Sequence, residues 1–394
     1  MIELIKLRPG FGKEEFQVFL AAAYDAGASD ITLQSGWKAI FHVHGVLLDV
    51  TDRPIQQNEM LYLAGLIYGD NAASLLSGGV DLDPRYEFNV GRGKRIGFRV
   101  NITSCRSGGN NSSISITLRA LPQIPLSLDV LRPPKPIYDA MFPSQGLVIV
   151  AGVTGSGKST LLAGGVRHIL ENMANHKILT YEKPIEYVYD EIKSHRSNVV
   201  AQHEIGNHLK TFSDGVHNAL RRAPTDILVG ESRDIETIDA TVEATLTGHT
   251  TYTTVHAETV GGVVSRMVQT FPYEAQSSIG EKIVSAARLI IVQRLARKAD
   301  GSGRIALNEW LAFGKEEKSA LGVVRAEKLG QEIDRMVFER GCSMAHMAAS
   351  KFGDGLISVE TAAAAAGVSI RDIEMLAAKV DKSVFLTAKT DGAN

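Results

Sequence analysis

Residues 152–159 read GVTGSGKS, a glycine-rich pattern of the kind that holds phosphate groups. It directly follows an apolar run and opens a segment with helical periodicity. Gly155 and Gly157 let the backbone turn tightly and direct its N–H groups at phosphate oxygens, and the following helix adds its positive end. Lys158 can reach the β- and γ-phosphates, and the Ser159 hydroxyl can bind Mg²⁺. The candidate nucleotide-binding residues are therefore Gly152, Thr154, Gly155, Ser156, Gly157, Lys158, Ser159 and Thr160.

This loop alone indicates a nucleotide, not an activity. It would suit a small-molecule kinase, a GTPase, a helicase or a motor. The sequence has no N-K-x-D tetrad that would read guanine, so a GTPase is the weakest of these interpretations.

Carboxylates follow the next two apolar runs. LTYEKPIEY (179–187) contains Glu182 and Glu186, and DILVG (226–230) is followed by Glu231. The carboxyl ends of strands line the ligand crevice of an open α/β sheet. A carboxylate there could accept a proton from an attacking water or hold Mg²⁺ through water. Taken alone, the first pair could equally form a solvated acidic turn.

Two histidines stand in TGHTTYTTVHAET (247–259), a threonine-rich run. His249 and His256 are seven residues apart, which puts them on opposite faces of a regular strand. Joint ligation of a metal is therefore not expected. One of them could sense the γ-phosphate or bridge to a carboxylate, and each by itself could also be an ordinary core or surface histidine.

The elements before the phosphate loop predict an α+β domain. Residues 14–26 have a helical pattern, and short strand-like runs follow. RIGFRVNI (95–102) and SISITLRA (113–120) alternate apolar and polar side chains, which is typical of half-buried antiparallel strands. The proline-rich run LRPPKPIY (131–138) predicts a domain boundary and a candidate hinge.

Apolar strands and amphipathic helices alternate after this boundary, which predicts a mostly parallel sheet. Beyond residue 300 a strand, IALNEWLAF, precedes helix-rich sequence, and residues 361–379 predict a pair of helices broken at Gly367. We expect three regions: residues 1–132, residues 133–300, and a C-terminal strand and helical extension over 301–394.

Composition excludes several classes of protein. The 394 residues carry a net charge of −2, so no global basic excess points to nucleic acid as a direct ligand. Cys105 and Cys342 are too few for a four-cysteine zinc site or a disulfide framework, which favours a reducing compartment. No apolar run approaches the ~20 residues needed to span a bilayer, so we expect no stable membrane insertion.

Four runs in this order, GVTGSGKST, YEKPIEY, DILVGESRD and TGHTTYTTVHAET, resemble the Walker A motif, acidic box, atypical Walker B motif and histidine box of the type II/type IV secretion and pilus ATPases. ASDITLQSG (28–36) resembles the start of that family's PAS-like domain. The runs YEFNVGRG, LTYEKPIEYVYDEI and NALRRAP look closest to the DotB-like type IVB branch and the TraJ ATPases of IncI-type conjugative plasmids. The implied fold is α/β: a PAS-like α+β N-terminal domain, a RecA-like P-loop ATPase domain and a helical C-terminal extension.

The resemblance also implies roles for the polar residues. Lys158 and Ser159 bind phosphate and Mg²⁺, Glu186 is the general base that activates water, and Glu231 organises Mg²⁺ and water. The other carboxylate of the acidic box is Glu182. His249 and His256 are expected to line the catalytic face.

Arg99, Arg106 and Arg119 match arginines of the family's N-terminal domain that can reach the phosphates when the two domains close. The alternation in the two strands independently places Arg99 and Arg119 on polar faces. The alternative is that they are surface arginines without a nucleotide contact.

The implied activity is that of a homohexameric ATPase, with ATP and Mg²⁺ as cofactors. It would power type IVB secretion or conjugative transfer by domain closure and opening. Its expected location is cytoplasmic, peripheral at the inner membrane through the apparatus, with a second cytoplasmic ATPase as a candidate partner. The four-cysteine module and the AIRNLIRE helix of pilus motors are absent, and Lys183 stands where the acidic box commonly has Asp. A pilus motor, a docking switch with little turnover and a nucleic-acid motor stay open as alternatives. The cargo, the docking partner, the ring symmetry and the role of residues 330–394 are not specified.

Overall fold

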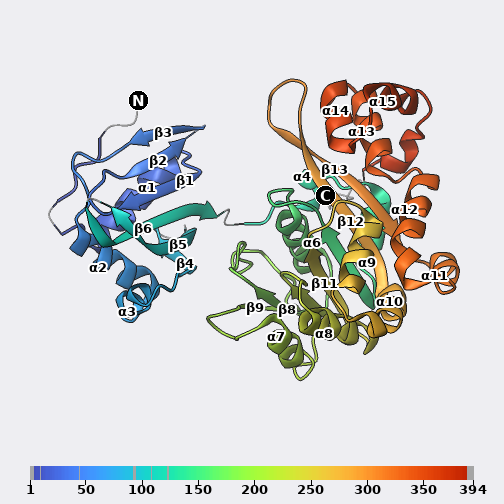
Figure 1. Cartoon of the computed structure of the whole chain (residues 1–394), viewed down its shortest axis with the longest axis horizontal. Coiled ribbons are helices and arrows are strands. Elements are labelled where there is room, and N and C mark those ends of the chain that lie inside the picture. Colours follow the sequence, from blue (N-terminus) through green and yellow to red (C-terminus); the bar gives the residue numbers. More distant parts are fainter. Residues whose placement is uncertain are drawn as a thin grey trace. The chain divides into compact units, whose positions relative to one another are not determined.

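The computed structural model describes residues 4–8, 10–43, 45–91, 95–107, 109–121 and 124–387. The chain divides into two compact units, drawn in Figure 1. The first comprises Met1–Ile124 and Pro184–Val188, and the second Pro125–Lys183 and Tyr189–Asn394. The end of the run YEFNVGRG (residues 92 and 93) and the last residues, 388–394, fall outside the described residues.

The first unit is built on a six-stranded antiparallel sheet in the order β3-β2-β1-β6-β5-β4. Its strands are β1 (Asp30–Gln34), β2 (Ile40–Val43), β3 (Val46–Asp49), β4 (Arg85–Asn89), β5 (Arg95–Ser107) and β6 (Asn110–Leu121). Its helices are α1 (Lys13–Asp25), α2 (Gln57–Tyr68) and α3 (Ala72–Ser77).

The predicted alternation in β5 is confirmed. Phe98 and Val100 are fully buried in the core of this unit, where α1 contributes Phe16 and Phe19. Arg99, between the two buried β5 residues, is exposed. The apolar face of the sheet therefore packs against the helix, and its polar face carries the arginines.

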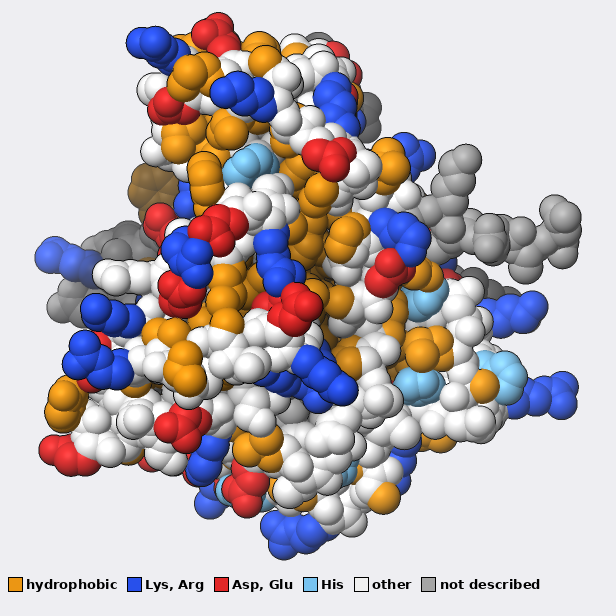
Figure 2. Space-filling model, turned by 90° about the vertical axis from the view of Figure 1, so that its right-hand side faces the viewer, with side chains coloured by type: hydrophobic (Ala, Val, Ile, Leu, Met, Phe, Trp, Pro, Cys, Tyr) orange, Lys and Arg blue, Asp and Glu red, His pale blue; other side chains and the backbone are white. Residues whose placement is uncertain are grey.

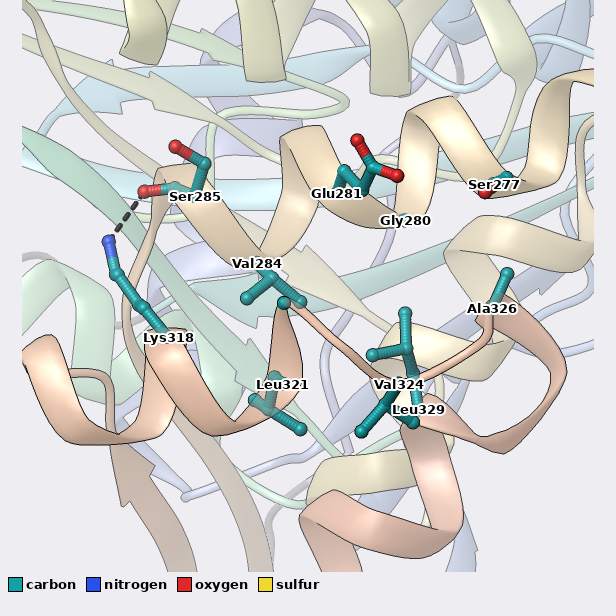
Figure 3. A pocket seen from close by; sticks show the side chains of 11 residues that line it. Ser277, Gly280, Glu281, Val284, Ser285, Lys318, Leu321, Val324, Ala326 and Leu329 are labelled. Atoms are coloured by element: carbon teal, nitrogen blue, oxygen red, sulfur yellow. Dashed lines mark hydrogen bonds between the residues drawn. The ribbon is translucent and has the colours of Figure 1, made fainter.

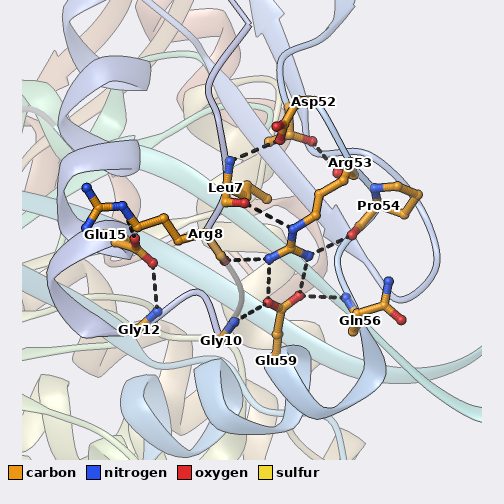
Figure 4. Close-up of polar contacts among 11 residues, drawn as sticks. Leu7, Arg8, Gly10, Gly12, Glu15, Asp52, Arg53, Pro54, Gln56 and Glu59 are labelled. Carbon is orange, nitrogen blue, oxygen red and sulfur yellow. Dashed lines mark hydrogen bonds and ion pairs between the residues drawn. The ribbon is translucent and has the colours of Figure 1, made fainter.

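A buried ion pair ties the start of the chain to α2 (Figure 4). The Arg53 guanidinium donates to both carboxylate oxygens of Glu59, at 2.6 and 2.9 Å, and to the Leu7 carbonyl at 3.1 Å. Glu59 also accepts from the backbone N–H groups of Gly10 (3.0 Å) and Gln56 (2.9 Å). Every hydrogen-bonding position of this 3% exposed carboxylate is thus used, which is the condition for burying a charge.

We predict that Glu59→Gln lowers the free energy of unfolding by about 3 kcal/mol, because it leaves Arg53 without its counter-charge. The hydrogen bond from Arg53 holds the pKa of Glu59 below its ordinary value of 4.5. The unfolded chain therefore binds the extra proton first, and the Glu59 contribution is present above pH 4.5 and lost as pH falls through the folded pKa. Denaturant unfolding at several pH values measures both effects.

The control is Glu15→Gln, which also removes a carboxylate that accepts a backbone N–H (Gly12, 3.4 Å) but from a more exposed site. We expect a loss below about 1 kcal/mol for this change. Equal losses for the two variants would contradict the assignment.

The second unit is built on a seven-stranded sheet in the order β13-β12-β7-β11-β10-β8-β9. All neighbours pair in parallel except β12 and β13, which are antiparallel. The strands are β7 (Gly146–Ala151), β8 (Lys177–Glu182), β9 (Val199–Glu204), β10 (Asp226–Val229), β11 (Thr250–Val255), β12 (Ala287–Arg297) and β13 (Arg304–Ala312). The predicted α/β class and its parallel sheet are confirmed, whereas β4, β9 and β12 were not predicted as strands.

The helices of the second unit follow the predicted alternation with the strands. They are α4 (Leu128–Leu131), α5 (Lys135–Ala140), α6 (Lys158–Asn172), α7 (Phe212–Ala219), α8 (Ile235–Leu246), α9 (Val260–Gln269), α10 (Tyr273–Ala286), α11 (Lys315–Leu321), α12 (Leu329–Glu339), α13 (Met344–Gly353), α14 (Val359–Ala366) and α15 (Ile370–Ala377), with short 3₁₀ turns at Ala326–Lys328 and Lys382–Phe385. Gly367 adopts φ 71° and ends α14, as its position in the helical pair predicted. None of the helices in the described ranges is long and apolar enough to cross a bilayer.

The proline-rich segment lies inside the second unit, which corrects its assignment as the hinge between domains. The chain changes unit at Pro125, before α4. Leu131 lies against α6, where a Cβ on Gly164 would come within 2.7 Å of it, and Lys135 N donates to the Leu386 carbonyl at 2.7 Å. Packing on both sides therefore fixes this segment, and its prolines shape short helices rather than a mobile link.

Figure 2 shows one face of the molecule, on which basic and acidic side chains are interspersed around apolar ones. A nucleic acid would need a continuous basic field. This face does not offer one among its described residues.

Candidate functional site

The phosphate loop connects β7 to α6. β7 is buried along its whole length, and the loop leaves it through Gly152 (φ 143°) and reaches α6 through Gly157 (φ 86°). Lys158 is the first residue of α6, and its Nζ donates to the carbonyl oxygens of Gly152 (3.0 Å) and Val153 (3.1 Å). The ammonium group is thus held over the loop, where phosphate oxygens can replace these carbonyls.

Two buried amide side chains brace the loop from behind. Gln293 of β12 donates from Nε2 to the Ser156 carbonyl at 2.7 Å, and Asn308 of β13 donates to Gln293 Oε1 at 3.1 Å. A Cβ on Gly157 would lie 2.7 Å from Gln293 Nε2, so this glycine is needed for the close approach. Our sequence reasoning missed both amides. Each stands next to a second polar residue, Arg294 or Glu309, in a strand of mixed composition, so no local signal marks them.

The Ser156 hydroxyl is buried in the loop and has no hydrogen-bond partner among the described residues. A buried hydroxyl without a partner is unfavourable by roughly 1–3 kcal/mol. This hydroxyl faces the interior beside Gly152, so the groups that the loop can offer to a phosphate are its backbone N–H groups and the Lys158 ammonium, which fit the nucleotide that the motif predicts. Thr154 and Ser159 are exposed, and Thr160 is partly exposed.

Glu231 and His256 come together at the ends of neighbouring strands, beside the phosphate loop. Glu231 follows β10, and the turn there is fixed by hydrogen bonds from Ser232 N to the Thr254 carbonyl (3.0 Å) and from Thr254 Oγ1 to the Gly230 carbonyl (2.5 Å). His256 follows β11 and places Nε2 3.8 Å from Glu231 Oε1. Burial, and then the charge of Lys158, lower the pKa of His256, so at neutral pH the imidazole is uncharged.

His249 lies at the other end of the same strand, which corrects its placement on the catalytic face. β11 begins at Thr250, opposite Gly146 of β7, whereas the phosphate loop follows Ala151. A strand of this length separates the two histidines by roughly 20 Å. His249 Nδ1 contacts the Ala244 carbonyl at 3.0 Å and closes the turn after α8.

The two glutamates of the acidic box fall in different units. Glu182 ends β8 in the second unit and accepts hydrogen bonds from Thr180 Oγ1 (2.6 Å) and Gln202 Nε2 (3.2 Å). Glu186 belongs to Pro184–Val188, which is part of the first unit. Its role as general base therefore remains a prediction.

Arginines form a row across three strands of the first unit. Arg99 of β5 stands directly opposite Arg119 of β6 and Arg85 of β4. Like charges directly opposite each other destabilise a sheet, and here acidic neighbours offset two of the three. Arg119 Nε lies 2.8 Å from Asp30, and Arg85 Nε lies 3.1 Å from Glu87.

Sequence reasoning missed Arg85, which also donates to the Ile185 carbonyl at 2.6 Å, next to Glu186 in the same unit. Arg106 is not part of the row. It lies at a bulge near the far end of β5, about 23 Å along the strand from Arg99.

A cavity of about 670 Å³ opens beside the phosphate loop. Its volume is in the range of ligand sites. Its wall combines the start of the phosphate loop, Arg233, the histidine segment and one side of α9 along its length: Gly152, Val153, Arg233, His256, Ala257, Glu258, Thr259, Gly262, Ser265, Arg266, Gln269 and Thr270. Arg233 and Arg266 give it the positive charge that a polyphosphate requires.

A second cavity, of about 330 Å³, lies between α10 and α11 (Figure 3). Lys318 points into it and donates to the Ser285 carbonyl, and burial lowers its pKa to about 8. None of the predicted nucleotide-site residues lines this cavity.

Comparisons with known proteins agree with this geometry. The family model "Type II/IV secretion system protein" matches residues 13–371. The chain is 32% identical to the type IV pilus retraction ATPase PilT of Pseudomonas aeruginosa over 290 residues, 74% of this chain and 80% of that protein. A twitching motility protein of Neisseria gonorrhoeae is 32% identical over 76% of this chain and 77% of its own length.

Solved structures give the same result. The X-ray structure of the ATPase DotB of Legionella pneumophila matches with a TM-score of 0.77 and 40% identity, covering 91% of this chain and 98% of that one. The pilus retraction motor PilT with bound ADP matches with a TM-score of 0.76 and 28% identity, covering 91% and 97%.

We predict that Gln293→Met weakens nucleotide binding about tenfold, because the Ser156 carbonyl loses its buried partner at a cost of roughly 1–3 kcal/mol and the loop shifts. Titration with a fluorescent ADP analogue measures the dissociation constant. The control is Gln145→Met. Gln145 also donates to a backbone carbonyl (Thr245, 3.1 Å), but it precedes β7 at the end away from the loop. Unchanged affinity in the Gln293 variant would exclude the brace.

Proposed function

The chain belongs to the type II/IV secretion system protein family, and from this premise we propose that it is a Mg²⁺-dependent ATPase that works as a homohexamer to power a type IVB secretion or conjugative transfer apparatus. Its relatives include proteins named as secretion and pilus ATPases, so ATP hydrolysis is the activity to expect of the family. The oligomer, the metal and the particular apparatus are our inference.

One observation carries the proposal. The phosphate loop, Glu231 and His256 lie at one edge of the parallel sheet, and the start of the loop and His256 border a cavity with a positively charged wall. The related PilT structure holds ADP, which supports the same ligand here.

In the proposed reaction the second unit binds ATP and the metal. Lys158 contacts the β- and γ-phosphates through Nζ, and backbone N–H groups of the loop bind the remaining oxygens. The Ser159 hydroxyl and, through water, Glu231 would hold Mg²⁺, which would neutralise charge on the phosphates. The neutral imidazole of His256 can accept a hydrogen bond from water or donate one to the γ-phosphate.

Proton transfer and charge stabilisation are assigned to the acidic box and the arginine row. Glu186 accepts the proton of the attacking water, and Glu182 orders the strand end from which the acidic box leaves β8. Arg85, Arg99 and Arg119 stabilise the charge that develops on the phosphates. ATP drives motion only if the closed arrangement of the two units binds it more tightly than the open one. The hinge then belongs at the change of unit near Pro125.

The type IVB or conjugative assignment is supported by the match to DotB, at 40% identity over nearly the whole of both chains. We place the ring at the cytoplasmic face of the inner membrane, where it would dock on the apparatus and on a second cytoplasmic ATPase. The alternative, a pilus motor, is supported by the 32% identity to PilT. A nucleotide-gated switch with little turnover is the other alternative. Direct nucleic-acid binding is not proposed, because the net charge is −2.

The deciding experiment measures ATP turnover and particle mass for the wild type and Lys158→Ala. We expect a ring of about six 42.5 kDa chains that hydrolyses ATP, and turnover near background in the variant, because the phosphates lose their cation. A wild-type monomer that binds ATP without hydrolysing it would replace the motor with the switch.

Glu186→Gln should bind ATP normally and hydrolyse it at least ~100-fold more slowly, because an amide cannot accept the proton of the attacking water. Single-turnover kinetics with a separate binding titration distinguish the two steps. Glu191→Gln, an exposed acid five residues further on, should behave as wild type. Near-normal hydrolysis by Glu186→Gln would remove this residue as the base.

A further inference from the structure

Glu309 of β13 joins two helices that are far apart in the sequence. Its carboxylate is 6% exposed. Oε1 accepts from the backbone N–H of Val260 at 2.8 Å, and Oε2 accepts from that of Met344 at 3.0 Å. Val260 is the first residue of α9 and Met344 the first residue of α13. One side chain thus holds the N-termini of both helices.

Neither helix can satisfy these two N–H groups by itself. The N-cap of α9, Thr259, accepts from Gly262 N at 2.9 Å, and the N-cap of α13, Ser343, accepts from His346 N at 3.4 Å. Each cap thus serves the third helical residue and leaves the first without a partner. The positive ends of the two helices stabilise the buried Glu309 carboxylate in return.

Two more residues tie the same turn to the C-terminal extension. Asp334 of α12 accepts from Gly261 N at 2.7 Å and from Thr259 Oγ1 at 3.0 Å. All three N–H groups at the start of α9 are therefore satisfied, two of them by acids from β13 and α12. Arg294 of β12 lies 3.5 Å from Glu258 and donates to the Ala365 carbonyl of α14 at 2.7 Å.

The turn held in this way follows His256 directly. Only three residues separate His256 from α9, and Thr259 and Gly262 line the same cavity as the phosphate loop. A shift of the first turn of α9 would therefore move both the cavity wall and the imidazole, which lies 3.8 Å from Glu231.

We propose that Glu309 is a positioning residue for ATP hydrolysis, which holds His256 in place by fastening the first turn of α9 to helix α13. The C-terminal extension thereby becomes part of the catalytic apparatus: its attachment sets the geometry at the phosphates. This inference rests on the proposed ATPase function, and it gives the extension a role that its sequence did not indicate.

The test is Glu309→Gln against Glu317→Gln, with nucleotide affinity, turnover and hydrogen exchange measured on the full chain. Glu317 is equally buried (5% exposed) and also accepts a helix N-terminal N–H, that of Gly314 at 2.7 Å, but it lies on α11. The amide at position 309 keeps the shape and can accept from only one of the two N–H groups. We expect its kcat to fall about tenfold with KM changed less than about threefold, because small displacements of catalytic groups reduce the chemical step.

Backbone amides of residues 256–262 and of the first turn of α13 should exchange faster in the Glu309 variant and not in the Glu317 variant. A Glu309 variant that matches the Glu317 variant in both kcat and exchange would overturn the proposal. Exchange is independent of turnover. If the Glu309 variant exchanges faster as expected but the wild type does not hydrolyse ATP, the ATPase assignment fails while the fastening of α9 stands.

A second pair of variants isolates the link to α13. Met344→Pro removes the N–H that Glu309 accepts, at a helix position that tolerates proline, whereas Met344→Ala loses the same buried side chain and keeps the N–H. We expect kcat of the proline variant to be several-fold below that of the alanine variant at similar thermal stability. Equal kcat values would show that α13 does not act on the site, and would overturn the proposal even if Glu309→Gln fails to fold.

Discussion

The register of three parallel strands is the constraint on which the candidate ATP site depends. Ala151 of β7 pairs with Val255 of β11 and with Val292 of β12. The next residue of each strand is then Gly152, His256 or Gln293, so the phosphate loop, the histidine and the brace stand at one level. Hydrogen bonds of the sheet set this alignment, and a slip of one residue would turn each side chain to the other face.

The outer strand β13 extends this arrangement through two neighbouring polar residues. Asn308 pairs with Gln293 across the antiparallel ladder, and its side chain donates to Gln293, which in turn donates to the loop. Glu309 points to the opposite face of the sheet, where it meets α9 and α13. Buried polar groups destabilise a fold unless all are hydrogen-bonded, and here each partner belongs to a different element. The hydrogen bonds that compensate for the burial of these polar side chains therefore also join the loop, the histidine segment and the extension.

Sequence reasoning found the residues whose chemistry is local and missed those whose role comes from distant contacts. The phosphate loop was predictable because its glycines, lysine and flanking elements lie in one short segment. The structure brings His256 to this loop and leaves His249 at the far end of β11, because the whole strand lies between the two histidines. Gln293 and Glu309 act on residues 137 and 49 positions away, and no local pattern reveals such partners. The prolines of 131–138 suggested a hinge, but packing against α6 decides their role.

In the arginine row of the first unit, by contrast, polar groups are not fully compensated. Like charges stand directly opposite each other on neighbouring strands, and acidic residues do not offset all of them. Arg99 stands between two other arginines, and the acids nearest the row, Asp30 and Glu87, contact the outer two. Such a row disfavours the isolated sheet, so stability alone does not explain it. Departures from local consistency concentrate at functional sites, where a ligand supplies the missing interaction. A polyphosphate carries the charge that this row lacks. This need agrees with the role that we propose for Arg99 and Arg119 at the phosphates.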